Sequence, residues 1–151
     1  MKSVRHSADL AEIERRLATL TPDTRPGWGR MSASGMVCHL TDAFDTVLGH
    51  RVSSYRSTRM ERTVVRLLAL SLPVPWPKGI PTVAEVDQER GGTAPGEFAA
   101  DMGRLRAALH DFVTRLPRES FSHPIFGPLT QAEWGRWGYR HVDHHLRQFG
   151  L

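Results

Sequence analysis

The C-terminal segment constrains the fold of this chain most strongly. Residues 130–149 contain no proline, and Thr130 is followed three positions later by Glu133. This spacing is typical of a capping box, in which each side chain binds the backbone N–H of the other residue at the start of a helix. We therefore expect a helix over residues 131–149.

Two histidines on this expected helix are candidates for a metal site. His141 and His145 lie one turn apart, so their rings project from the same face. Two imidazoles at this spacing can hold one metal ion. With eight histidines in 151 residues, such a pair also arises by chance, and neutral histidines hydrogen-bonded in the core are the alternative. The metal interpretation therefore requires a third ligand elsewhere in the chain.

Four other segments repeat apolar residues at helical spacing, namely 8–20, 34–49, 56–72 and 96–116. Ser7 and the stretch 32–34 are N-cap candidates for the first two, while Gly49 and Pro117 are the expected ends of the second and fourth. The proline-rich stretch 73–81 predicts an extended connector, residues 88–96 predict a loop, and no segment is convincing as a strand. We therefore expect one all-α domain over residues 1–151, a four-helix bundle with an extra short helix and a proline-rich crossover loop.

Composition argues against several classes of protein. The net charge is only +4, and the arginines are spread along the chain, so we expect no nucleic-acid partner. The N-terminus lacks the apolar core of a signal peptide, and the longest apolar run, residues 67–74, is too short to span a bilayer. The single cysteine, Cys38, fits a reducing compartment and is expected to be buried and inert. A cytoplasmic protein without a membrane partner is the resulting expectation.

Candidates for the rest of a metal site lie near the expected second and last helices. His39 is a sound third ligand, because a bundle core gathers side chains from facing helices. Asp42, one turn later, could accept a ligand N–H, bind the metal, act as a base, or remain an ordinary exposed charge. His144 points about 60° from His141 and about 100° from His145, so we expect it to lie beside the ligands or at the rim.

Two stretches of sequence resemble a known family. They are the early run Met36-Val-Cys-His-Leu40 and the late run from His123 to Gly150, which ends in H-x-x-H-H-L-x-Q-F-G. The chain resembles the DinB-like superfamily of metal-dependent proteins, and is most similar to a subfamily of unassigned function with this C-terminal motif. Residues 51–95 match nothing distinctive. The resemblance implies a four-helix bundle whose metal ligands are His39, His141 and His145.

The resemblance also suggests what such a site does. The superfamily includes transferases and isomerases that use low-molecular-weight thiols, and its members are commonly dimers. Three neutral imidazoles leave a divalent ion its full charge and an open position, without choosing among Zn²⁺, Ni²⁺ and Fe²⁺. Such a centre lowers the pKa of a bound water or thiol.

Two functions follow as hypotheses. The first is an enzyme that transfers a thiol or water to an electrophilic small molecule, with Asp42 or His144 as the proton carrier. In this hypothesis Trp134, Trp137 and the proline loop around Trp76 shape the pocket. The second is a non-catalytic metal- or ligand-binding stress-response module. A homodimer is the expected assembly in either case.

Overall fold

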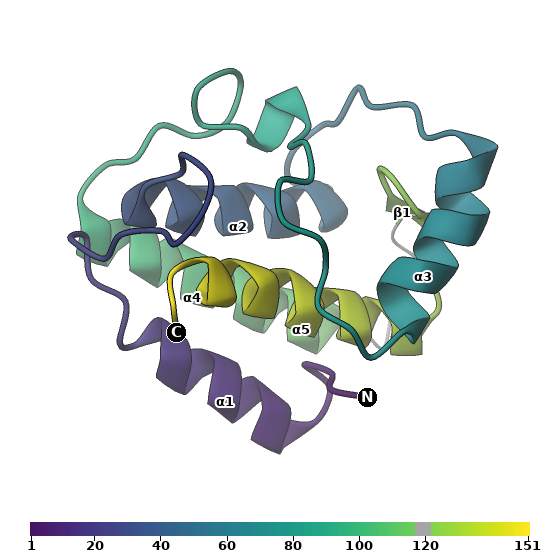
Figure 1. Ribbon diagram of the computed structural model, residues 1–151, viewed down its shortest axis with the longest axis horizontal. Coiled ribbons are helices and arrows are strands. Elements are labelled where there is room, and N and C mark those ends of the chain that lie inside the picture. Colours follow the sequence, from purple (N-terminus) through teal and green to yellow (C-terminus); the bar gives the residue numbers. More distant parts are fainter. Residues whose placement is uncertain (117–121) are drawn as a thin grey trace.

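The computed structural model describes residues 1–116 and 122–151, and within them the chain is mainly helical (Figure 1). This confirms the expected fold class. None of the helices in this part of the chain combines the length and the apolar character needed to cross a membrane. The longer helices are α1 (Ser7–Leu17), α2 (Ala33–Val47), α4 (Phe98–Arg115) and α5 (Gln131–Gln148). The shorter elements are η1 (Glu61–Val65), α3 (Arg66–Ser71), η2 (Ala84–Val86), β1 (Ser122–His123) and β2 (Gly127–Pro128).

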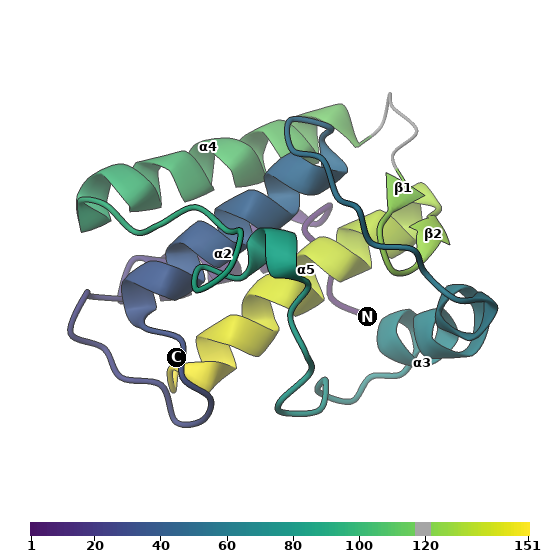
Figure 2. The same cartoon turned by 90° about the horizontal axis from the view of Figure 1, so that it is seen from above.

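The helix α2 forms the centre of the packing. It lies between α4 and α5, while α1 packs along α5 and the short α3 lies near the start of α5 (Figures 1 and 2). The rings of Phe44, Phe112 and Trp137 meet where α2, α4 and α5 converge, with centroids 5.1–5.6 Å apart. Burial of such aromatic side chains is a main source of stability in a core of this size. The core therefore holds α2 and α5 side by side.

The predicted capping box at the start of α5 is present. The Thr130 hydroxyl accepts from the Glu133 N–H at 3.3 Å, and the Glu133 carboxylate accepts from the Thr130 N–H at 2.8 Å. Arg66 donates to both oxygens of the same carboxylate, at 2.8 and 2.7 Å. Although burial opposes the charge, these bonds hold the pKa of Glu133 at about 2. A single carboxylate thus joins α3 to the first turn of α5.

The other helix ends agree with the predictions in part. Ser32 caps α2 by accepting from the Gly35 N–H at 3.0 Å, and Gly49 follows the helix with a φ of +80°. The prediction that Ser7 caps the first helix is wrong, because Ser7 is already helical. Asp9 instead holds the preceding chain, where its carboxylate accepts from the Ser3 N–H at 3.0 Å. The predicted end of the fourth helix at Pro117 lies outside the described residues.

The third helix begins later than predicted. Residues 52–58 have no helix or strand, the chain is helical from Arg59, and the elements η1 and α3 run from Glu61 to Ser71, whereas the sequence predicts a helix over 56–72. Thr58 and Glu61 explain the difference, since they form a second reciprocal pair. The Thr58 N–H donates to the Glu61 carboxylate at 2.6 Å, and the Glu61 N–H donates to the Thr58 hydroxyl at 3.2 Å. This is the same S/T-x-x-E signal that marks the start of α5.

A small hairpin corrects the expectation that the chain has no strand. β1 and β2 pair antiparallel, with His123 opposite Gly127. The His123 Nδ1 accepts from the N–H groups of Ile125 and Phe126, both at 3.1 Å, and Gly127 takes a φ of +69° that favours glycine. Strands of two residues are too short to show an alternating pattern in the sequence.

Candidate metal centre

Three histidines from two helices converge inside the fold. His39 comes from α2, while His141 and His145 come from α5. One nitrogen from each ring lies within 4.8 Å of the others, and the ring centroids are 4.7–5.2 Å apart. Histidine, cysteine and acidic side chains are the usual metal ligands in proteins. Among the residues that the structure describes, these three histidines are the one group of such side chains arranged to hold an ion. The three residues predicted from the sequence are thus brought together.

One pair of ring nitrogens has a separation that suits metal binding. His39 Nε2 lies 3.2 Å from His141 Nε2. Two nitrogens that are each about 2.0–2.1 Å from one ion lie about 2.8–3.4 Å apart in octahedral or tetrahedral coordination. The observed separation falls inside this range, so these two rings fit one cation.

Hydrogen bonds orient two of the three rings. His39 Nδ1 lies 2.7 Å from the carbonyl oxygen of Val86 in η2, so it donates its proton there. His145 Nδ1 lies 3.0 Å from the side-chain oxygen of Gln148, whose amide nitrogen donates to the Trp28 carbonyl at 2.9 Å. In a neutral imidazole this leaves the Nε2 lone pair free to bind a metal. Sequence reasoning missed Val86 and Trp28, and it assigned no orienting role to Gln148.

The third ring has a polar atom without a partner. His141 Nδ1 is buried and makes no hydrogen bond to any described residue. If the proton is on Nδ1, that N–H has no acceptor and the two Nε2 lone pairs of His39 and His141 face each other. If it is on Nε2, the buried Nδ1 lone pair has no donor. A cation between the two Nε2 atoms removes the repulsion between their lone pairs, so the two facing nitrogens fit a bound cation.

Burial keeps the cluster neutral. It lowers the pKa of His39, and it lowers the pKa values of His141 and His145 well below their usual range, with the neighbouring imidazoles adding to the effect. Metal binding requires neutral imidazoles, so the cluster is prepared to bind an ion without first losing protons near pH 7.

Aromatic rings form the walls of the cluster. Trp137 lies 5.2 Å from His141 and belongs to the core, together with Trp134. On another side, the Trp76 ring lies 6.0 Å from His141, and its N–H donates to the Ala69 carbonyl at 2.8 Å. The tryptophans predicted to shape a pocket are therefore divided between the core and the proline-rich connector.

His144 lies beside the cluster rather than in it. Its ring is half-buried, 5.2 Å from His145 and 6.1 and 5.9 Å from the rings of Trp28 and Trp76. Burial lowers the pKa of His144, which favours the neutral ring. The residue thus stands between the cluster and the surface, as its angle on the helix predicts.

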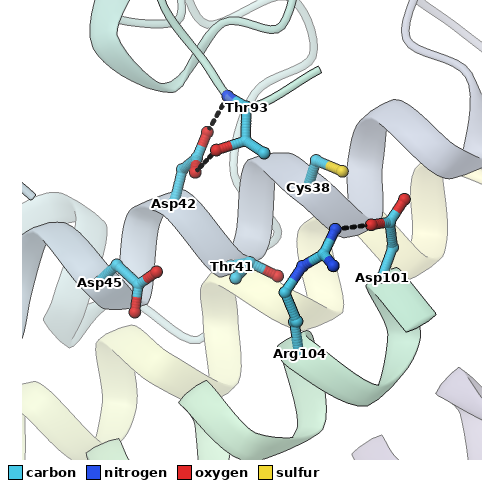
Figure 3. Close-up of a pocket in the computed structure, with 7 residues that line it drawn as sticks. All are labelled: Cys38, Thr41, Asp42, Asp45, Thr93, Asp101 and Arg104. Carbon is cyan, nitrogen blue, oxygen red and sulfur yellow. Dashed lines mark hydrogen bonds and ion pairs between the residues drawn. The ribbon is translucent and has the colours of Figure 1, made fainter. Parts of the chain in front are cut away.

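Asp42 occupies a different environment from the three histidines. Its carboxylate accepts from the Thr93 N–H and the Thr93 hydroxyl, both at 2.7 Å (Figure 3). It also accepts from Arg51 at 3.2 Å. It is buried, and these bonds join the loop after η2 to α2. An ordinary exposed helix charge was one expectation, and the burial of Asp42 contradicts it.

A pocket of about 140 Å³ lined mainly by polar and charged residues lies next to Asp42. The buried Cys38 faces it together with Asp101 and Arg104 (Figure 3). Burial, with a contribution from Asp101, raises the pKa of the Cys38 thiol to about 11. The thiol is therefore protonated near pH 7, in line with the inert cysteine expected from the sequence.

Comparison with known proteins identifies a family. The model of the DinB superfamily matches residues 4–149, which is nearly the whole chain. Neither the curated proteins nor the solved structures give a match.

Proposed function

This chain belongs to the DinB superfamily, and on that premise we propose that it is a divalent-metal-dependent enzyme acting on a small molecule. The observation that carries the proposal is the convergence of His39, His141 and His145, with donor atoms within 4.8 Å of one another. Residues 1–151 act as one domain in this proposal. The setting is the cytoplasm, which suits a protein with a free, buried Cys38.

The three histidines would hold Zn²⁺, Ni²⁺ or Fe²⁺ through their Nε2 atoms. An ion bound there would supply Lewis acidity, which lowers the pKa of a thiol or water. Val86 and Gln148 fix the rings of His39 and His145 so that their lone pairs point inward. The substrate class that suits this chemistry is an electrophile that accepts a thiol, or alternatively water.

We assign the proton carrier to His144. A neutral imidazole beside the ligands can accept the proton that a thiol or water releases and can pass it to solvent. Asp42, the other candidate, has both carboxylate oxygens engaged by Arg51 and Thr93. Its role in the proposal is therefore to position the loop over α2.

Metal content tests the ligand assignment. Freshly purified protein should contain about one divalent ion per chain by elemental analysis, and His141→Ala should remove most of it, because two nitrogens alone hold an ion weakly. His110→Ala, at an exposed position on α4, is the matched control. Full metal occupancy in His141→Ala would contradict the assignment of His141 as a ligand.

Turnover tests the enzymatic part of the proposal. Metal-loaded protein should convert a panel of electrophiles with a thiol cosubstrate, and chelation should abolish the product. A metal-loaded His144→Gln variant should keep its ion and lose rate. If no electrophile gives a metal-dependent product, the protein is not this kind of enzyme.

The second candidate is a non-catalytic metal- or ligand-binding stress-response module. The burial of the rings favours it, because His39 is only 4% exposed and His145 only 8%. A structural site keeps its ion closed off from solvent, whereas a catalytic site keeps an open position. In this case chelation would lower the melting temperature, and the metal-loaded protein would show no catalytic activity.

A further inference from the structure

A second pocket lies on the outer side of α5, away from the pocket beside Asp42. The proline-rich connector passes across α5 in Figure 1. The pocket is lined by this connector, α5 and the first residues of the chain. Its volume is about 300 Å³, which is at the lower end of the range for small-molecule sites. We call it the connector pocket, and its lining includes Lys2, Val74, Trp76, Arg140, His144 and Arg147.

One row of α5 side chains faces the connector pocket. Arg140, His144 and Arg147 follow one another at intervals of four and three residues, so they share a side of the helix. This row runs beside the row of His141 and His145. His144 belongs to the pocket lining, and its ring is 5.2 Å from that of His145. The pocket is therefore adjacent to the histidine cluster.

Arg140 is a partly buried cation without a carboxylate partner among the described residues. Two of its nitrogens donate to the carbonyl oxygens of Leu72 and Val74, and its guanidinium lies 5.8 Å from the centre of the Trp76 ring. Its Nε is buried and unpartnered. A cation in this state attracts an anion.

The remaining charges add to the positive excess. Asp143, the acidic side chain of the pocket, already accepts from both Arg16 and Arg147 at 2.7 Å. Lys2 is paired with Glu12, which lies outside the pocket lining. Three cationic side chains thus line a pocket with one carboxylate, and that carboxylate is shared between two arginines.

We propose that the connector pocket binds the carboxylate of a small anionic molecule whose other end reaches the histidine cluster past His144. Arg140 and Arg147 recognise the carboxylate, and Val74 and Trp76 contact the apolar part. The binding of the anion is inferred from the pocket alone. The idea that the other end of the molecule reaches the metal rests on the proposed function. The substrate class of the proposed enzyme is thereby narrowed to carboxylates.

Calorimetry on metal-free protein tests the pocket directly. The probes are 3-mercaptopropionate and its neutral analogue 3-mercapto-1-propanol. We expect the carboxylate to bind about fivefold or more tightly than the alcohol, and Arg147→Gln and Arg140→Gln each to remove most of this preference. Arg106→Gln, which removes the same charge from an exposed position on α4, should change nothing. Equal affinity for the two probes, or an unchanged preference in Arg147→Gln, would overturn the proposal.

The design separates this proposal from the metal hypothesis. Arg140 also holds the connector through two carbonyls, so its variant is interpreted only if its melting temperature matches that of the parent. If the Arg140 variant is destabilised, the result for Arg147→Gln decides, because Arg147 is exposed and its replacement should not affect folding. If the purified protein contains no metal but prefers the carboxylate probe, the anion site is supported and the proposed metal-dependent activity is contradicted. If the protein binds metal but binds both probes equally, the metal site is supported and the anion site is contradicted.

Discussion

Among single residues, Gln148 offers the sharpest test of how the cluster is organised. Its side chain accepts from His145 Nδ1 and donates to the Trp28 carbonyl. Gln148→Leu removes the acceptor, so His145 loses its fixed orientation, and we expect the metal affinity to fall by about 10–100-fold. Competition with a chromophoric chelator measures the change.

A conservative variant distinguishes orientation from packing. Gln148→Glu keeps an acceptor for the His145 N–H and should retain most of the affinity, although it loses the bond to Trp28. If the leucine and glutamate variants lose affinity equally, Gln148 acts only through packing and does not orient the ligand.

The parts of the site that local sequence patterns predict lie close together in the chain, whereas the parts that they do not predict are far apart in the sequence. The pairing of His141 with His145 follows from helical geometry alone, and Gln148 lies only three residues further on. His39 is about a hundred residues away; the packing of helices in a bundle made it a candidate, and the family resemblance implied it as the third ligand. The Val86 carbonyl that orients His39 could not be foreseen, because any backbone carbonyl can accept a hydrogen bond and no residue type marks it.

At the scale of elements, the carboxylate between α3 and α5 predicts how stability depends on pH. The pKa of Glu133 falls from an ordinary value of 4.5 to about 2 in the folded protein. Its contribution is therefore fully present above about pH 4.5 and is lost as the pH falls toward 2. Glu133→Gln should lower the free energy of unfolding by about 1–2 kcal/mol at pH 7, after allowance for solvent screening.

Urea unfolding at two pH values provides the measurement. The difference between the parent and Glu133→Gln should be clear at pH 7 and should shrink markedly near pH 2.5, since the parent carboxylate is then partly protonated. Glu14→Gln, at an exposed position on α1, is the control and should show little effect at either pH. A difference that does not change with pH would mean that the charge of Glu133 is not what stabilises the junction.

Local signals explain which elements were anticipated. The capping box of α5 is a strong signal, and the helix begins at Gln131 as predicted. The same signal at Thr58 and Glu61 was overlooked, because the segment was recognised from its apolar residues alone. The hairpin could not be recognised, since it depends on a buried histidine whose Nδ1 accepts from two backbone N–H groups.

For the molecule as a whole, the region between α2 and α4 proves to complete the site. Within residues 51–95 the sequence predicts a helix over 56–72, a connector and a loop, and of these residues it assigns a role at the site only to the proline loop around Trp76. In the folded chain this region supplies Val86 to orient His39, Trp76 to cover His141, and Thr93 to engage Asp42. These contacts join segments distant in sequence, so they arise from the packing of the whole chain rather than from a local pattern.

An exposed apolar face on the same region predicts the assembly. Leu67 and Leu68 are 62% and 50% exposed, and with Met60, Val64 and Leu72 they form one side of η1 and α3. Such a row, about 18 Å long, is unusual on the surface of a monomer. Two copies related by a twofold axis can bury their rows against each other, so we propose a homodimer through this face.

Light scattering of a surface variant tests this assembly. The double substitution Leu67→Ser and Leu68→Ser should convert a dimer into a monomer, because it removes the apolar area that drives association. Both side chains are exposed within one copy, so the variant should remain folded by circular dichroism. Val52→Ser removes an exposed apolar side chain outside α3 and should leave the dimer intact. A parent protein that is monomeric at high concentration, or a double variant that remains dimeric, would show that two copies do not associate through this face.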